Sequence, residues 1–409
     1  MTRRRLGLFQ GYGVELEYMI VHRETLAVLP VADALLKEAA GRTVNEVKRG
    51  PLRWSNELVL HVVELKTNGP AAALEGLAGE FSRQALEINR MLEPFAGMLM
   101  PGAMHPWMEP DLETKLWPHG NRDIYNAYNQ VFGCRGHGWS NLQSAHLNLP
   151  FANDDEFGRL HAAVRLVLPL LPAIAAASPV VGGKVTGLLD NRLEVYRFNQ
   201  ARIPSITGQV IPEAAFTRET YQQVILEAMY RDIAPHDPVG ILQEEWLNSR
   251  GAIARFERNT IEIRLLDVQE CPAADLAIQQ LVVAVIRELV TETRATREAQ
   301  QAWHESQLAG IFTTVLREGR GCLIDDARYL AMFGVDAASM TVGELWRTLA
   351  ERLIPGQNEA WSALQVIFDE GPLARRLLAA LGDDPDRDRL AAVYRELCDC
   401  LQEGTLFRA

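Results

Sequence analysis

The first segment of the chain alternates apolar and polar residues in the pattern of a half-buried strand. Between positions 11 and 21, the alternating apolar residues are Tyr12, Val14, Leu16, Tyr18 and Ile20. Because successive side chains of a strand point to opposite faces, Glu15 and Glu17 share the other face, roughly 6 to 7 Å apart. Two carboxylates on one face repel each other unless water or a cation lies between them. The pattern therefore predicts either a solvated strand face or a site for a cation.

Two later segments are predicted as strands of the same design. The polar face carries Ser144, His146 and Asn148 in the segment 142–149, and Thr260, Glu262 and Arg264 in the segment 259–267. An antiparallel sheet whose apolar face is covered by helices would gather the polar residues of all three strands on its other face. We therefore predict one site that contains Glu15, Glu17, His146, Glu262 and Arg264.

Two further acidic residues, Glu57 and Glu64, belong to a predicted strand over 56–67. They are seven positions apart, so an ideal strand would place them on opposite faces. Both can join one site only if Glu57 precedes the strand or if a β-bulge lies between them. The apolar neighbours of Glu64 favour a buried functional carboxylate, whereas the pattern leaves the place of Glu57 undecided.

Longer patterns with helical apolar spacing predict the helices of the fold. These helices cover residues 31–41, 71–95, 154–177, 217–233 and 272–302. Residues 178–212 combine many glycines and polar residues with little helical pattern, and we predict a loop on the substrate side. From residue 303, helical patterns with acidic loops replace the strands. The prediction is an α+β fold with a catalytic domain over 1–302 and a helical C-terminal extension over 303–409, packed on the core.

Composition and charge narrow the class of protein. The 409 residues carry a net charge of −12, which argues against a nucleic-acid-binding surface. The longest apolar run contains Pro169 and Pro172 and lies in an amphipathic context, so no segment is predicted to span a membrane. The five cysteines are odd in number and scattered, which indicates a reducing cytoplasm rather than a disulfide framework.

The clustered carboxylates are the main chemical signal in the chain. In this number they are unstable together without compensating cations. Mg²⁺ and Mn²⁺ are the natural compensators, because they take oxygen ligands and bridge phosphates. The sequence has no glycine-rich phosphate loop, no nucleophile elbow and no histidine and cysteine set with zinc spacing.

Six short motifs follow one another along the chain. They are Gly13-Val14-Glu15-Leu16-Glu17, Glu57 with Glu64, Gly102-Ala103-Met104-His105-Pro106, Gln143-Ser144-Ala145-His146-Leu147-Asn148, Ala177-Ser178-Pro179 with Thr186-Gly187 and Arg192, and Thr260-Ile261-Glu262-Ile263-Arg264-Leu265-Leu266-Asp267. In this order they resemble the carboxylate–amine ligase branch of the second family of glutamate–cysteine ligases. The resemblance covers about residues 10 to 300.

The resemblance implies a fold like that of glutamine synthetase and the guanidino kinases, in which a curved antiparallel sheet forms an active-site funnel with helices outside. It implies ATP-dependent activation of a carboxylate as an acyl phosphate, followed by attack of an amine, with glutamate and cysteine as the default pair. It also implies two or three Mg²⁺ ions, with Mn²⁺ as an alternative. The implied metal ligands are Glu15, Glu17, Glu57, Glu64 and Glu262, and the implied nucleotide neighbours are His146 and Ser144.

The arginines and one carboxylate receive more specific roles. Arg264 would stabilise charge on the transferring phosphoryl group, or it would pair with a neighbouring strand carboxylate. Glu64 is the second catalytic candidate. Arg192 would clamp a substrate carboxylate with a bidentate hydrogen bond, or it is a surface arginine. Arg258 is a further candidate for contact with ATP phosphates.

Three functions remain open on the sequence. The leading one is the ligase, with small-molecule amino acid and amine substrates and ATP as partners. The second is a phosphotransferase of the same sheet architecture, and the third is a non-catalytic relative that binds nucleotide or metal. The identity of the amine and the oligomeric state, with a homodimer among the options, stay undetermined.

Overall fold

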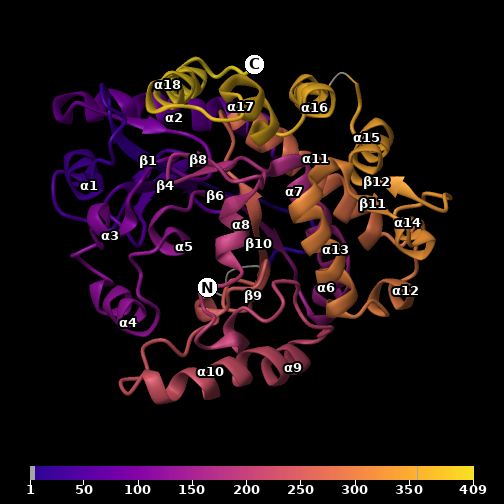
Figure 1. Ribbon diagram of the computed structural model, residues 1–409. Coiled ribbons are helices and arrows are strands. Elements are labelled where there is room, and N and C mark those ends of the chain that lie inside the picture. Colours follow the sequence, from indigo (N-terminus) through magenta and orange to yellow (C-terminus); the bar gives the residue numbers. More distant parts are fainter. Residues whose placement is uncertain (1–4, 357) are drawn as a thin grey trace.

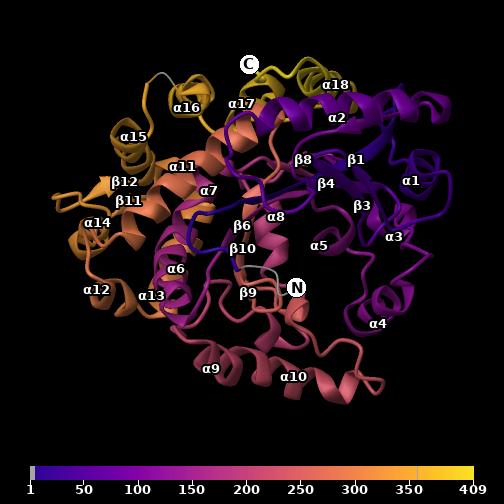
Figure 2. The ribbon, with the colours of Figure 1, turned by 180° about the vertical axis from the view of Figure 1, so that it is seen from behind.

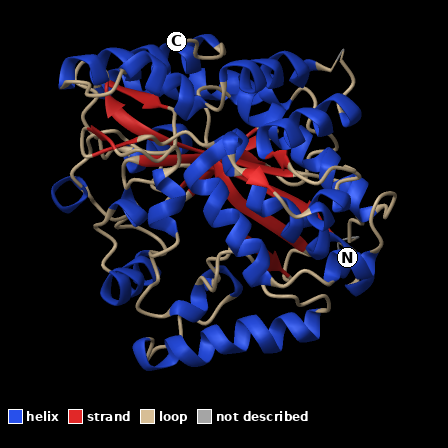
Figure 3. Ribbon diagram, turned by 45° about the vertical axis from the view of Figure 1, so that its right-hand side comes forward, coloured by secondary structure: helices blue, strands red, loops and turns tan. Residues whose placement is uncertain are grey.

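An open antiparallel sheet of eight strands runs through the middle of the molecule (Figure 3). The computed structural model describes residues 5–356 and 358–409. The order of the strands is β2-β3-β4-β1-β6-β10-β9, and β5 pairs with β1 off this path. The strands are β1 (Gly13–His22), β2 (Glu46–Arg49), β3 (Leu52–Asn56), β4 (Val62–Thr67), β5 (Gly97–Met100), β6 (Ser144–Pro150), β9 (Ala252–Arg255) and β10 (Thr260–Asp267). The prediction of a fold that combines helices with an antiparallel sheet is confirmed.

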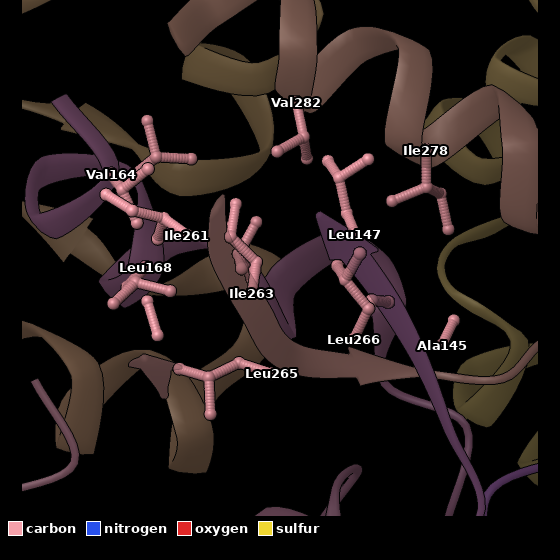
Figure 4. Packing of buried hydrophobic residues seen from close by; sticks show 14 of the residues in the cluster. Ala145, Leu147, Val164, Leu168, Ile261, Ile263, Leu265, Leu266, Ile278 and Val282 are labelled. Atoms are coloured by element: carbon pink, nitrogen blue, oxygen red, sulfur yellow. The ribbon is translucent and has the colours of Figure 1, made fainter. Parts of the chain in front are cut away.

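The strand predicted first, β1, is the centre of the sheet. One edge of β1 pairs with β4, while the other edge pairs with β6 at its start and with β5 at its end. Val14, Leu16, Tyr18 and Ile20 are fully buried, as their alternation predicts. The corresponding apolar residues of β6 and β10 pack beneath α6 (Asp154–Val167) and α11 (Pro272–Val290), as Figure 4 shows for Leu147 and Ile263. The helices therefore cover the apolar face and leave the polar face to the site.

Helices surround the sheet, and they are arranged as Figures 1 and 2 show from opposite sides. Besides α6 and α11, they are α1 (Ala32–Ala40), α2 (Leu77–Leu92), α3 (Pro110–Glu113), α4 (Arg122–Phe132), α5 (His137–Ser140), α7 (Pro172–Ala175), α8 (Asn191–Tyr196), α9 (Arg218–Tyr221), α10 (Glu227–Ile233), α12 (Arg297–Gln301), α13 (Glu305–Glu318), α14 (Ala327–Met332), α15 (Val342–Leu353), α16 (Glu359–Glu370), α17 (Leu373–Leu381) and α18 (Arg387–Glu403). None of these described helices is long and apolar enough to cross a bilayer.

Three predicted helices are longer than the helices of the structure. The helix predicted from residue 71 begins at Leu77, after Gly76 adopts a left-handed φ of 78°. The helix predicted over 154–177 is divided by Pro169 and Pro172, which lack the backbone N–H that a continuous helix needs. The helix predicted over 272–302 stops at Val290 and resumes as α12.

The prediction of one strand over 56–67 is wrong. The structure has two strands there, β3 and β4, joined by a loop over residues 57–61. This loop is held by backbone hydrogen bonds to other segments, such as the one from the amide of Leu60 to the carbonyl of Lys115. Glu57 therefore lies before the strand that carries Glu64, which was one of the two arrangements that would bring both residues to one site.

The segment after residue 303 is mostly helical and packs against the earlier part of the chain. Helix α16 contacts α11, and α18 contacts α2 (Figure 1). A buried ion pair joins Arg376 of α17 to Glu270, just before α11. Two short paired strands, β11 (Leu323–Ile324) and β12 (Met340–Thr341), correct the expectation that strands disappear here.

The segment predicted as an irregular loop also contains regular structure. It forms two short paired strands, β7 (Val180–Val181) and β8 (Lys184–Val185), and then α8. Asp190 begins α8 by accepting a hydrogen bond from the amide of Leu193 at 2.8 Å. The five cysteines are buried and free, so none forms a disulfide.

Candidate active site

A cavity of about 740 Å³ opens on the polar face of the sheet. Every candidate site residue from the sequence lines this cavity: Glu15, Glu17, Glu57, Glu64, Ser144, His146, Arg192, Arg258, Glu262 and Arg264. Four different strands, helix α8 and two connecting loops supply them. The sheet has therefore brought together residues that are up to 249 positions apart in sequence.

A chain of hydrogen bonds links β1 to β6 across the floor of the cavity. Glu17 accepts hydrogen bonds from the backbone amide of Ser144 at 2.7 Å and from its hydroxyl at 3.0 Å. The Ser144 hydroxyl lies 2.8 Å from Nε2 of His146, whose Nδ1 lies 3.2 Å from Glu15. Asn148 donates to the other oxygen of Glu15 at 3.1 Å. Each oxygen of Glu15 is thus held in a fixed direction toward the cavity.

A glycine makes room for this arrangement. Gly13 lies opposite Asn148 in the β1–β6 register. A Cβ atom at position 13 would come within 2.8 Å of the Asn148 Cβ, which is closer than real Cβ contacts. The first motif residue, Gly13, is therefore needed for Asn148 to lie over β1 and reach Glu15.

Two groups of three ligand atoms converge closely enough to hold metal ions. Glu15, Glu64 and His146 form one group, while Glu17, Glu57 and Glu64 form the other. Within each group, the ligand atoms lie within 4.8 Å of one another. Glu64 belongs to both groups. The geometry places Glu57 with the other carboxylates, which the strand pattern alone left undecided.

The pKa values of these carboxylates diverge because they share a buried space. Burial raises the pKa of Glu64 to about 7, with Lys66 opposing this shift and Glu15 adding to it. Burial also raises the pKa of Glu57 well above its usual range, assisted by the charges of Glu64 and Glu17. For Glu15, burial acts in the same direction, but the hydrogen bond and charge of His146 hold its pKa well below the usual range. Protonation of some carboxylates is the response of a site that lacks sufficient positive charge.

Lys66 is a site residue that the sequence prediction missed. It lies on β4 two positions after Glu64, and its ammonium forms an ion pair with that carboxylate. Burial would lower the pKa of Lys66, but the charges of Glu64 and Glu15 raise it. The alternation of side chains along a strand that groups Glu15 with Glu17 also puts Lys66 on the same face as Glu64. The sequence pattern could therefore have identified Lys66 as a site residue.

A β-bulge in β10 sets the position of Arg264. Ile263 pairs with Leu147, whereas the next pair joins Leu266 to Ala145, so Arg264 and Leu265 together face one residue of β6. Nε of Arg264 lies 2.9 Å from Glu262. Arg264 thus lines the cavity and also has the strand carboxylate partner that the sequence offered as the alternative.

Arg255 is the second residue that the prediction missed. It lies on β9 opposite Thr260, and its guanidinium is 3.6 Å from Glu262 and 2.6 Å from Glu257. Only the pairing of β9 with β10 places it on the polar face. Arg258, which the sequence did name, lies in the turn between these strands and is largely exposed at the rim of the cavity, 3.4 Å from Glu257.

Arg192 has a buried partner of its own. It lies on α8 with 2% of its side chain exposed, and its Nε forms an ion pair with Asp267. The alternative of a surface arginine is therefore wrong. Asp267 also accepts hydrogen bonds from the amide of Ala177 at 2.7 Å and from the Ser178 hydroxyl at 3.1 Å. This network fixes one wall of the cavity, and the motif residues Ser178, Arg192 and Asp267 are its members.

The donor set suits a hard divalent cation. One group offers only carboxylate oxygens, which Mg²⁺ and Mn²⁺ prefer, and the other adds one imidazole nitrogen. The fold and the site thus define a mixed α/β protein whose open antiparallel sheet presents an acidic cavity for a metal and an anionic substrate.

A comparison of the sequence with models of known protein families identifies the family of this chain. A family model described as glutamate–cysteine ligase family 2 matches residues 12–396, so the chain belongs to that family. The match continues well beyond the range of about 10 to 300 that the motifs cover. The protein is accordingly a ligase that forms amide bonds and is similar to glutamate–cysteine ligases.

Relatives of known sequence share most of the chain. A protein of Archaeoglobus fulgidus, whose name states no activity, is 31% identical over 397 residues, covering 97% of this chain and 99% of the relative. A protein of Enterobacter sp., provisionally named glutamate–cysteine ligase 2, is 22% identical over 380 residues, covering 88% of this chain and 92% of the relative.

Solved structures share the fold at low sequence identity. The glutamate–cysteine ligase of Francisella tularensis in complex with AMP superposes with a TM-score of 0.60 at 11% identity, covering 96% of this chain and 88% of that one. A bifunctional glutathione synthetase of Pasteurella multocida gives a TM-score of 0.56 at 13% identity, covering 95% of this chain and 53% of that one.

Proposed function

We propose that this protein is an ATP-dependent carboxylate–amine ligase that activates its acid substrate as an acyl phosphate, with glutamate and cysteine as the default pair. The observation that carries the proposal is the convergence of Glu15, Glu17, Glu57, Glu64 and Glu262 in one cavity beside the cationic groups of Arg255 and Arg264. A triphosphate and a carboxylate are both anionic, so a site that joins them needs cations between the reactants. Family membership and the AMP complex of the Francisella tularensis enzyme support ATP as the nucleotide.

The acidic residues would hold two or three Mg²⁺ ions, or Mn²⁺ in their place. When bound, these ions would screen the triphosphate charge and orient it for transfer. Glu64 would be central, because it belongs to both convergent groups. The hydrogen bonds from Ser144 to Glu17 and from Asn148 to Glu15 would keep these carboxylates directed into the cavity.

The reaction would proceed in two transfers. In the first, an oxygen of the acid substrate attacks the γ-phosphorus of ATP, the bond from that phosphorus to ADP breaks, and an acyl phosphate forms. In the second, the amine nitrogen attacks the acyl carbon, the bond from that carbon to the phosphate oxygen breaks, inorganic phosphate leaves with the proton that the nitrogen gives up, and the amide remains. Arg264 would stabilise charge on the transferring phosphoryl group, an effect that is worth roughly 3 to 4 kcal/mol for a well-placed donor.

The surrounding residues would complete the binding site. His146 and Ser144 would lie near the nucleotide, and Arg258 at the rim would contact its phosphates. Arg192 would meet the carboxylate of the acid substrate, although Asp267 already holds one edge of its guanidinium. The open sheet would act as the funnel of a glutamine-synthetase-like fold. Since every residue that lines the cavity precedes residue 303, we propose residues 1–302 as the catalytic domain and 303–409 as its helical support.

A trapping experiment tests the proposal even while the natural amine is unidentified. The protein is incubated with ATP, Mg²⁺ and a panel of acids that includes glutamate, aspartate and simple dicarboxylates. Hydroxylamine, a small and strong nucleophile, is added in place of the amine. We expect slow ADP release without a nucleophile, and faster release with formation of a hydroxamate when hydroxylamine is present.

The controls separate the ligase from its alternatives. Glu64→Gln should abolish hydroxamate formation while the far-ultraviolet circular dichroism spectrum stays unchanged. If ATP binds normally but no acid yields a hydroxamate, the ligase proposal is wrong. Recovery of a stable phosphorylated product in that case would identify a phosphotransferase of the same fold.

A further inference from the structure

One side of the cavity is formed by aromatic rings rather than by charged groups. These rings are Tyr128 of α4, Trp139 of α5, Tyr196 of α8 and Trp246 in the short helical turn Glu245–Leu247. We call this set the aromatic wall. It contrasts with the floor of the cavity, where the sheet presents carboxylates, lysine and arginines.

Three rings of the aromatic wall pack together into one surface. Tyr128 is buried at the centre, with its ring centroid 5.5 Å from that of Trp139 and 5.8 Å from that of Trp246. Phe132 stacks on Trp139 from behind at 5.6 Å. Trp139 and Trp246 themselves are only half-buried, and both line the cavity. Three separate segments thus meet around Tyr128 and present indole surface to whatever enters.

The position of the wall relative to the floor indicates which substrate it meets. The turn that carries Trp246 packs against β9, and β9 pairs with β10, the strand that carries Arg264. The charge of Arg264 also opposes the rise in the pKa of Tyr128 that burial causes. The convergent metal groups begin beside Arg264, at His146 of β6, and extend away from it across β1 and β4 to Glu57 in the loop before β4. Beyond them, the cavity is lined by Asn45 and Glu46 at the start of β2 and by Tyr125, whose hydroxyl accepts a hydrogen bond from Asn56 beside Glu57. A triphosphate lying over the metal groups with its γ-phosphoryl group at Arg264 would therefore direct its nucleoside toward this polar end.

We infer that the aromatic wall is the subsite for the acceptor amine. In place of the default cysteine, this amine carries an aromatic ring or a bulky apolar group larger than the side chain of cysteine. The inference rests on the proposed ligase function, because it needs the amine to approach the acyl phosphate from the side of Arg264. Aromatic rings bind planar apolar groups through edge and stacked contacts, and their faces also attract an ammonium group. A thiol as small as that of cysteine would leave most of the wall without contact.

Steady-state kinetics with a panel of amines tests the inference. The panel contains cysteine, alanine, phenylalanine, tyramine, tryptamine and isoamylamine, with the acid found by hydroxylamine trapping and saturating ATP. We expect kcat/KM for the aromatic and bulky apolar amines to exceed that for cysteine and alanine by at least about tenfold, which corresponds to roughly 1.4 kcal/mol. A clear preference for cysteine or alanine would overturn the inference.

Variants of the wall separate the amine from the nucleotide. Trp246→Ala and Trp139→Ala should each raise the KM for the preferred amine about tenfold or more, while the KM for ATP and the hydroxylamine reaction stay unchanged. Trp246→Phe should restore most of the affinity, because it keeps an aromatic face. Trp361→Ala in α16 removes a half-buried tryptophan outside the cavity and is the matched control.

The hydroxylamine reaction also keeps the two proposals distinguishable. If the wild-type protein forms no hydroxamate, the ligase function itself is contradicted. If it forms the hydroxamate but prefers cysteine or alanine as the amine, only the inference is contradicted. Calorimetric titration of ATP with Mg²⁺ into Trp246→Ala gives a second readout. If these variants weaken ATP binding and leave the amine KM unchanged, the wall holds the adenine ring instead, and the inference is wrong.

Discussion

The buried ion pair between Arg192 and Asp267 lends itself to a double-mutant cycle. Both side chains are almost fully buried, and Asp267 also holds the segment of Ala177 and Ser178. We would compare Arg192→Met, Asp267→Asn and the double variant with the wild-type protein. Methionine replaces the unbranched stem of the arginine without its charge, and asparagine keeps a carbonyl oxygen for the hydrogen bonds from Ala177 and Ser178.

The size of the effect follows from burial. Removing one partner of a buried ion pair leaves the other charge without compensation and costs about 3 to 5 kcal/mol. Removing both charges eliminates that penalty, and such replacements are often neutral or stabilising. We therefore expect each single variant to lose about 3 kcal/mol or more of unfolding free energy, and the double variant to lose less than either single variant. Since whole domains are stable by about 5 to 15 kcal/mol, the single effects are large.

Urea unfolding followed by circular dichroism measures all four unfolding free energies, and the KM for the acid substrate is measured in parallel. If the ion pair only supports the side of the cavity beside Asp267, the increase in KM caused by Arg192→Met should be corrected, at least in part, in the double variant. A direct clamp on the substrate carboxylate predicts a raised KM in both proteins that lack Arg192. Additive losses of stability, with no coupling between the two substitutions, would refute the assignment of a buried ion pair.

Three further outcomes are expected. Mg²⁺ should raise the melting temperature of the wild-type protein and raise that of Glu64→Gln much less, because Glu64 belongs to both convergent groups. Equal increases in the melting temperatures of the two proteins would exclude Glu64 as a ligand. Glu15→Gln and Glu262→Gln should each lower ATP turnover by orders of magnitude with the fold intact, and near-wild-type turnover at saturating Mg²⁺ would remove that residue from the site. Burial lowers the pKa of His161 to about 3. Between about pH 6.5 and 3 only the unfolded chain binds a proton at this residue, so the free energy of unfolding falls as the pH falls. His161→Phe should reduce the slope of unfolding free energy against pH by up to about 1.4 kcal/mol per pH unit, and an unchanged slope would contradict this.

Much of the candidate site could be predicted because its residues lie on strands. The period of two fixed Glu15 and Glu17 on one face of β1, and the same rule assigned His146 and Glu262 to the polar faces of β6 and β10. The pairing of Glu15 with His146 then follows from the neighbouring positions of β1 and β6 in the sheet. Periodicity also extends to Lys66, which the prediction omitted.

Glu57, Arg255 and the aromatic wall depend on features that periodicity does not record. Glu57 reaches the site from a loop, whose path is set by hydrogen bonds to a segment more than fifty residues away. Arg255 needs the pairing of β9 with β10, and Trp139 and Trp246 need helical turns that lie over the cavity from outside the sheet. The helix ends at Leu77 and Val290 were likewise misplaced, because apolar spacing continues past the point where the backbone turns away.

The sequence by itself determined the alternating strands, the face on which their carboxylates lie and the family to which the motifs point. These features are local, because the direction of each side chain along a strand depends on the backbone of that strand alone. Only the tertiary structure decided the strand order, the bulge that positions Arg264, the burial of Arg192 against Asp267 and the separation of the cavity into an acidic floor and an aromatic wall. Those features come from contacts between distant segments, and each such contact depends on how the apolar faces of the sheet and helices pack together.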